Sequence, residues 1–204
     1  MGILERRERE KKALRERILE AARKLFAEEG YESVSMRKIA GKIEYSPTVI
    51  YLYFRDKQEI IKELCDEMFN LLLKKIDKTI KTVADPVERL KAGLRVYVEF
   101  GIKHPDHYRV TLMMPHKHAA ACPEKFETTA GAQTFQRLFD AVAACVQSGR
   151  FREKDVMLVS QSLWVAIHGL TALWITKREE DFPWADRDRL IDFTIDTAVG
   201  GLLR

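Results

Sequence analysis

The side chains that could bind a metal or act as nucleophiles are scattered along this chain of 204 residues. Histidine and cysteine come closest together at His116, His118 and Cys122, and zinc prefers imidazole and thiolate ligands. Their spacing matches no structural zinc pattern, and His104 or His107 would have to complete the site. The sequence therefore favours a polar loop here over a metal site. It also contains no nucleophile elbow, phosphate-binding glycine loop or dinucleotide fingerprint, so we expect neither an enzyme nor a cofactor.

A second group combines aromatic rings with one titratable donor. Trp164 and His168 lie four residues apart and therefore share a helix face. The aromatic residues that could line an apolar pocket with them are Tyr97, Phe100, Tyr108, Phe135 and Phe139. The alternative is an ordinary core with a hydrogen-bonded histidine, because aromatic residues at helical spacing more often pack than bind. The identity of a ligand cannot be read from these residues.

A third group, between Ser35 and Lys57, has side chains suited to contact a nucleic acid. Two short helices joined by a tight turn are predicted to pack through Ile39, Ala40, Ile43, Ile50 and Phe54. The residues left near the surface are Arg37, Tyr45, Pro47, Thr48, Val49, Tyr51, Leu52 and Tyr53. Exposed aromatic and β-branched residues suit contact with thymine methyl groups, base edges and phosphates. For the two tyrosines at positions 51 and 53, partial burial against the next helix is the alternative.

The elements that position these groups are predicted to be helices throughout. Residues 1–16 read as a frayed or mobile basic arm, and apolar spacing of three and four begins at Ile18. Gly30 is expected to end that helix in the left-handed conformation, and Ser33 or Ser35 to cap the next. Ser46 with Pro47 opens a third helix, and Asp56 is expected to cap the fourth. Further helices are expected at about 57–82, 86–104, 106–113, 124–148, 155–177 and 187–203, with a loop at 114–123 and Ile60, Ile61, Leu64, Met68, Leu71, Leu72 and Ile76 as the apolar stripe of the fourth helix.

Charge divides the chain into two parts. Residues 1–57 hold 14 Lys and Arg against 10 Asp and Glu, whereas residues 58–204 hold 21 against 21. The formal excess of +4 therefore lies in the first quarter, as expected for a small nucleic-acid-binding head, although a solvated charged helix gives the same count. The sequence contains no run of 18 uncharged apolar residues, so we expect no membrane-spanning helix. The three cysteines are widely separated, which suits free thiols in the cytoplasm.

The segment from residue 15 to 62 resembles the tetracycline-repressor (TetR) family of bacterial regulators. The matching positions are Arg17 to Tyr31, Ile39-Ala40, Ser46, Ile50-Tyr51, Tyr53-Phe54 and Lys57. The resemblance implies an all-α fold of about nine helices. A three-helix, helix-turn-helix head would occupy residues 1–57, and a ligand-binding and dimerisation bundle residues 58–204. It implies a DNA-binding regulator, most simply a repressor released from a pseudo-palindromic operator by a small, largely apolar effector.

The resemblance also assigns roles residue by residue. Phosphate contacts fall to Ser35, Tyr51, Tyr53 and Lys57. Arg37 falls where some members read a guanine, and Pro47, Thr48 and Val49 fall at base-reading positions. Tyr45, Ser46 and Leu52 complete the expected DNA-binding surface. The chain departs from the family at Glu44, where glycine is usual: either the turn takes another conformation or Glu44 tolerates a left-handed one, with its side chain directed away from DNA.

In the family, the last two helices form the dimer. Here the residues expected at that interface are Ala166, Ala172, Ile195, Ala198, Val199 and Leu202. The stretch from Leu163 to Leu170 also resembles the Trp-His-Gly type of C-terminal domain. Two other classes stay open: an enzyme or ligand carrier whose first fifty residues only package the body, and an activator or adaptor built on the same fold.

Overall fold

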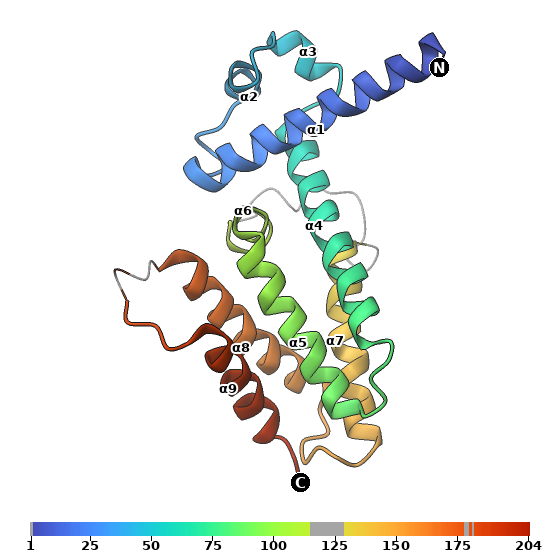
Figure 1. Ribbon diagram of the computed structural model, residues 1–204, viewed down its shortest axis with the longest axis vertical. Helices are drawn as coiled ribbons and strands as arrows, with labels where there is room; N and C mark the ends of the chain where they lie inside the picture. Colours follow the sequence, from blue (N-terminus) through green and yellow to red (C-terminus); the bar gives the residue numbers. More distant parts are fainter. Residues whose placement is uncertain (1, 115–128, 178–179, 181) are drawn as a thin grey trace. The chain divides into compact units, whose positions relative to one another are not determined.

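The computed structural model describes residues 2–114, 129–177, 180 and 182–204. These residues form nine α-helices and one π-helix, with an isolated β-bridge between Phe151 and Leu203 (Figure 1). The all-α class predicted from the sequence is therefore confirmed. The histidine and cysteine group at 116–122 lies outside the described residues. The chain divides into two compact units, residues 1–68 with 106–123 and residues 69–105 with 124–204.

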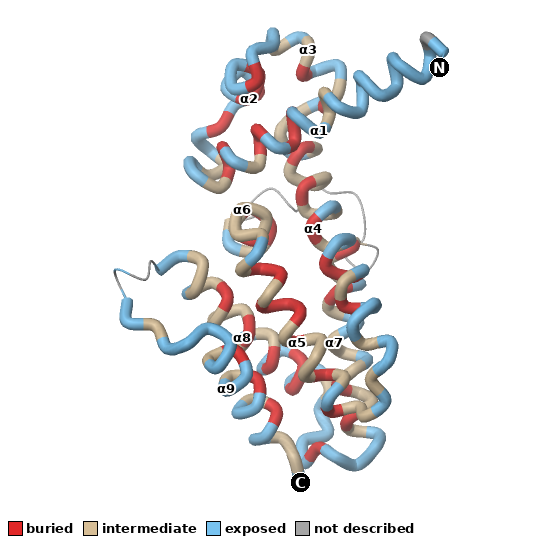
Figure 2. The backbone as a smooth tube through the Cα atoms, in the orientation of Figure 1, coloured by how far each residue is buried: buried red, intermediate tan, exposed pale blue. Residues whose placement is uncertain are grey.

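The first unit contains α1 (Ile3–Glu29), α2 (Met36–Lys42), α3 (Pro47–Tyr51) and the first part of α4 (Lys57–Ile80). Ser35 caps α2, since its hydroxyl accepts a hydrogen bond from the Lys38 amide at 3.2 Å. Pro47 occupies the first position of α3, where its missing N–H has no cost. The helices pack around one apolar core, whose fully buried members include Ile18, Ala22, Phe26, Ile39, Ala40, Ile50, Phe54 and Ile60 (Figure 2).

The first helix begins much earlier than predicted. It starts at Ile3, so residues 3–16 form a helix and not a frayed arm. The Glu5 carboxylate accepts a hydrogen bond from the Gly2 amide at 3.0 Å, and Arg6 pairs with Glu10 one turn later at 2.7 Å. The sequence signal was missing because these turns have no core to pack against, and apolar periodicity appears only where a helix buries a face.

Gly30 ends α1 as predicted, but with different backbone angles. Its φ is 79° and its ψ is 162°, whereas a left-handed residue has a ψ near 50°. This region is essentially restricted to glycine, because a Cβ atom would clash with the neighbouring backbone. The glycine is therefore required at the α1–α2 connection for a more restrictive reason than the sequence indicated.

The segment predicted as one helix at 106–113 consists of two elements. Helix α6 (Pro105–Tyr108) is followed by a π-helix, η1 (Arg109–Met113). Val110 is fully buried in the core of the first unit, and η1 packs against α1. A segment far from the first 68 residues in sequence thus completes the core that supports α2 and α3.

The second unit contains the rest of α4, α5 (Pro86–Lys103), α7 (Ala130–Gln147), α8 (Val156–Thr176) and α9 (Arg187–Gly200). Helix α5 packs against α7, α8 and α9 and is the centre of this unit. Gly131 allows a close approach, since a Cβ atom there would lie 3.0 Å from the Phe69 ring. Leu71, expected on the apolar stripe of α4, is instead 43% exposed.

Helix α8 is long and apolar enough to cross a membrane by length and composition alone. Only 28% of its most apolar stretch is buried within the protein. Its buried side, which includes Val159, Leu163 and Ile167, faces the helices of its own unit. Its other side carries Leu158, Val165 and Leu173, which the described part of the chain leaves exposed.

Candidate nucleic-acid interface and effector site

The short helix α3 presents apolar and aromatic side chains to solvent. Ile50 is fully buried, whereas the side chains around it are not: Tyr51 is 54% exposed and Leu52 is 76% exposed. Ser35, Arg37, Tyr45, Ser46 and Thr48 are also exposed, and Pro47, Val49, Tyr53 and Lys57 are half-buried. The surface predicted from the sequence is therefore present. Tyr53 packs partly against the core, as the alternative allowed, but Tyr51 does not.

The turn before α3 is a Schellman motif with glutamate at the position that favours glycine. The Tyr45 amide donates to the Ala40 carbonyl at 3.0 Å, and the Glu44 amide donates to the Gly41 carbonyl at 3.2 Å. Glu44 has a φ of 61°, so it adopts the left-handed conformation and tolerates the strain. Glycine fills the equivalent position after α7, where Gly149 has a φ of 73° and the same two hydrogen bonds form.

Arg17 supports this turn, a role that the sequence did not reveal. Its guanidinium donates to the Ile43 carbonyl at 3.4 Å and lies 5.4 Å from the centre of the Tyr45 ring. Arg15 lies at the other end of α3, with its guanidinium 4.6 Å from the centre of the Phe54 ring and ion-paired with Glu63. Both contacts join residues distant in sequence, so helical spacing could not predict them.

Lys57 holds the start of α4 against the α1–α2 connection. Its ammonium donates to the carbonyl oxygens of Tyr31 at 2.8 Å and Val34 at 2.9 Å, and it lies 4.1 Å from the centre of the Tyr31 ring. An ammonium group has three N–H donors, so one remains for a phosphate. Lys57 therefore has a structural role in the head in addition to the phosphate contact expected from its position.

Asp56 caps α4, as predicted. Its carboxylate accepts a hydrogen bond from the Glu59 amide at 2.9 Å, which lowers the pKa of Asp56, and Arg55 lowers it further. The folded head therefore favours the ionised cap. The stability that it supplies is present above the ordinary pKa of an aspartate and is lost as the pH falls through the lowered value.

Two family models match this chain and together cover most of it. Residues 18–64 match the bacterial regulatory proteins of the tetR family, and residues 90–198 match the tetracyclin repressor-like C-terminal domain. The chain belongs to the TetR family. It is accordingly a DNA-binding transcriptional regulator with an effector-binding C-terminal domain, and not an enzyme.

Individual relatives are distant but cover most of the chain. A fatty acid metabolism regulator protein from Bacillus subtilis (strain 168) is 24% identical over 160 residues, which cover 78% of this chain and 81% of the relative. The solved fatty acid degradation regulator FadR from Bacillus halodurans has a TM-score of 0.76 at 22% identity, and the match covers 93% of this chain and 97% of that one. AibR, solved with isovaleryl coenzyme A and operator DNA, has a TM-score of 0.71 at 21% identity, covering 93% and 97%.

The second unit brings together four of the seven residues expected at the effector site. The Trp164 indole donates to the Tyr97 hydroxyl at 3.2 Å, and that hydroxyl lies 3.4 Å from Nδ1 of His168. The Phe135 ring meets the Trp164 ring edge-on, with the ring centres 6.5 Å apart. Burial lowers the pKa of His168, so its neutral form is favoured. This arrangement is compatible with both interpretations of the sequence, an apolar ligand pocket and an ordinary core with a hydrogen-bonded histidine.

The remaining three expected residues are placed differently. Phe100 is buried, with its ring 4.6 Å from that of His104, and Phe139 is half-buried in α7. Tyr108 is almost fully buried, but it belongs to the first unit. The packing within the two units therefore does not support the prediction that Tyr108 lines a site in the second unit.

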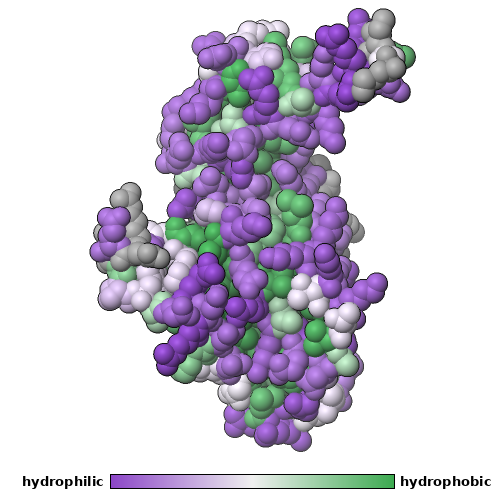
Figure 3. Space-filling model, in the orientation of Figure 1, coloured by the Kyte–Doolittle hydropathy of each residue, from purple (hydrophilic) through white to green (hydrophobic). Residues whose placement is uncertain are grey.

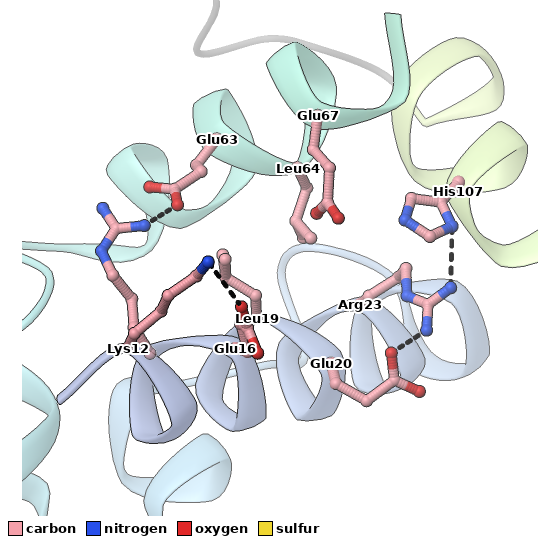
Figure 4. Close-up of a pocket in the computed structure, with 10 residues that line it drawn as sticks. Lys12, Glu16, Leu19, Glu20, Arg23, Glu63, Leu64, Glu67 and His107 are labelled. Carbon is pink, nitrogen blue, oxygen red and sulfur yellow. Dashed lines mark hydrogen bonds and ion pairs between the residues drawn. The ribbon is translucent and has the colours of Figure 1, made fainter. Parts of the chain in front are cut away.

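A cleft of about 540 Å³ lies within the first unit, between α1, α4 and α6 (Figure 4). Arg23 of α1 points into it, pairing with Glu20 and contacting Nδ1 of His107 at 2.7 Å. On the α4 side, Glu63 pairs with Arg15. Charged residues of both signs thus line the cleft. An ion pair joins α1 to α4, and the Arg23–His107 contact joins α1 to α6.

Members of the TetR family are dimers, and α8 and α9 have an apolar side that a second copy would cover. Two of the expected interface residues were wrong: Ile195 is 3% exposed and Val199 is fully buried within their own chain. Val165 and Phe193 are instead 66% and 69% exposed. The error has a simple cause, since apolar spacing on a helix does not distinguish the face toward its own core from the face toward a partner.

Proposed function

We propose that this protein is a homodimeric repressor that binds a pseudo-palindromic operator and is released from it by a small, largely apolar ligand. The observation that carries the proposal is the surface of α3, where Tyr51 and Leu52 are exposed beside a fully buried Ile50. Exposing such residues costs solvation free energy in a protein that acts alone, and contact with base edges and thymine methyl groups offsets it.

The division of labour follows the chain. Residues 1–57 would read DNA through the surface that extends from Ser35 to Lys57, and residues 58–204 would bind the effector and form the dimer. Arg37 lies in the first turn of α2, and its side chain is exposed. One short helix per chain makes too few contacts for specific affinity, so two copies would read successive major grooves about 34–36 Å apart.

The test is selection of bound fragments from random duplex DNA. A repeated, inverted half-site, bound by two copies of the chain, is the expected result. A folded dimer that binds no duplex even at low salt would contradict the proposal. A monomer bound to one unrepeated site would contradict the dimeric mode.

We place the effector beside Trp164, Tyr97, Phe135 and His168. Three aromatic rings provide apolar surface, and the imidazole and hydroxyl provide hydrogen bonds that fix orientation. The names of two relatives refer to fatty acid metabolism or degradation, and AibR was solved with isovaleryl coenzyme A. The acyl group of such a ligand would supply the apolar part, and isovaleryl coenzyme A and a long-chain acyl coenzyme A are therefore the first ligands to titrate against a preformed complex with the selected duplex. Free coenzyme A, which has the charged part alone, is the control.

The switch would act through α4 and α6, because both have residues in the unit that contains α3. Release requires that the ligand bind the released conformation better than the DNA-competent one. A tenfold loss of operator affinity needs a difference of only about 1.4 kcal/mol, which one well-filled apolar pocket can supply. The contact of Arg23 with His107 ties α6 to α1 and is a route for this coupling.

We also propose that the protein works in the cytoplasm, as its family and its cysteines suggest. Cys145 is a buried free thiol whose Sγ donates to the Pro86 carbonyl at 3.3 Å. Burial raises the pKa of this thiol to about 11, which disfavours the reactive thiolate. Cys145 therefore behaves as a small core residue and not as a redox sensor.

A further inference from the structure

The N-terminal turns of α1 extend past the core of the first unit. Every described side chain from Leu4 to Ala13 is exposed, and Leu14 is the first that packs against the core (Figures 1 and 2). At a rise of about 1.5 Å per residue, the eleven residues from Ile3 to Ala13 form an overhang about 17 Å long. We call residues 2–13 the overhang.

The overhang is basic, and part of its acidic charge is already engaged. It holds five Lys and Arg residues against three Glu residues. Glu5 accepts from the Gly2 amide, and Glu10 pairs with Arg6. Hydrophilic side chains make up most of its described surface in the space-filling view (Figure 3). Among the side chains of the overhang whose burial is described, Leu4 is the one large apolar residue that is exposed, which is little apolar surface for a protein partner.

The free positive charge lies on one face of the helix. Arg7 and Lys11 continue, at helical spacing, the face that packs Leu14 and buries Ile18. Within the described part of the chain, neither Arg7 nor Lys11 has an ion pair, and Glu8 borders the same face. Past the core, the packing face of α1 thus becomes a basic surface.

The base of the overhang lies beside the DNA-reading helix. Arg17 contacts Ile43 and Tyr45 just before α3, and Arg15 stacks on Phe54 just after it. The overhang therefore begins at the level of α3 within the same compact unit. Lys11 lies about one helical turn before Arg15, so the basic face adjoins the part of α1 that contacts the ends of α3.

We propose that Arg7 and Lys11 of the overhang bind the DNA backbone next to the half-site read by α3. This inference rests on the proposed DNA-binding function. Duplex DNA has one negative charge per about 1.7 Å of its axis, so its charge is opposite in sign to that of the basic helix face. At about 3.4 Å per base pair, the overhang reaches phosphates within about five base pairs of the reading helix. These contacts add affinity without adding sequence preference.

The experiment compares two variants with the same change in charge. Arg7→Ala/Lys11→Ala removes the proposed contacts, and Arg6→Ala/Lys12→Ala removes two charges from other faces of the same overhang. Alanine is the best helix former, and circular dichroism confirms that helicity is kept. The probe is the duplex recovered by selection with the wild-type chain. Its affinity for each protein is measured by fluorescence anisotropy between about 50 and 200 mM salt.

Four contacts per dimer predict that Arg7→Ala/Lys11→Ala reduces the slope of log affinity against log salt by about 3.6. The control variant should change it by less than about 1. Equal slopes for the two variants would overturn the inference, since net charge alone would then explain the effect. A folded wild-type dimer that binds no duplex would overturn the proposed function as well. Strong wild-type binding that neither variant affects would overturn only the role of the overhang and leave the proposed function standing.

Discussion

Replacing Glu44 by glycine should stabilise the DNA-binding head and strengthen its binding to DNA. Glu44 occupies the C′ position of the Schellman turn with a φ of 61°, where an L-residue costs about 1–2 kcal/mol. Glycine removes that strain, but it gives the unfolded chain more freedom, worth about 0.4–1 kcal/mol. The net gain in the free energy of unfolding is therefore about 0.5–1 kcal/mol. For a domain of this size, the melting temperature should rise by a few degrees.

Charge and strain are separated by a second variant, Glu44→Gln. Glutamine keeps the Cβ atom and the strain but removes the negative charge next to the surface assigned to DNA. Both variants should bind a duplex a few times more tightly at low salt, because an exposed carboxylate within a Debye length of phosphates opposes binding. Only Glu44→Gly should raise the free energy of unfolding.

Thermal and urea denaturation followed by circular dichroism measure stability, and fluorescence anisotropy measures DNA affinity. Gly149 provides an internal reference: Gly149→Ala puts a Cβ atom into the same motif and should cost about 1 kcal/mol. Loss of stability in Glu44→Gly, or an equal gain in Glu44→Gln, would refute the assignment of strain to this turn.

Three further predictions concern the head, the dimer and the effector site. Arg37→Ala should relax base preference at one position per half-site at a cost of about 1–3 kcal/mol in binding. Lys57→Ala should weaken binding to all duplexes and lower the stability of the head, because two carbonyl oxygens lose their partner. If both variants affected specific and random duplexes equally in binding assays, this distinction would be contradicted. Val165→Arg or Phe193→Arg should shift the sedimentation of the dimer toward the monomer, and an unchanged dimer would place the interface elsewhere. Because burial lowers the pKa of His168, its contribution to stability is complete above its ordinary pKa and declines as the pH falls below it. His168→Ala should flatten that decline in denaturation titrations and weaken induction by the ligand, with operator affinity unchanged. Loss of both operator binding and stability would instead identify His168 as a core residue.

Local chemistry determined much of the head from the sequence alone. Ser35, Ser46-Pro47 and Asp56 marked helix starts that the structure places within a residue or two, because capping depends on neighbours in the chain. The helix-turn-helix core followed from spacing, and the TetR resemblance from short motifs. Even the unusual Glu44 was recognisable as a departure, although its left-handed conformation needed the backbone angles.

Contacts between distant segments were decided only by the tertiary structure. Val110 joins the head core from a segment about sixty residues past the end of α3, and Arg17 supports the turn before α3 across 26 residues. The interface prediction at Ile195 and Val199 failed because periodicity reports that a face is buried and not what buries it. The overhang was missed for the converse reason: a helix stabilised by charged residues of high propensity, without a core beside it, leaves no apolar period in the sequence.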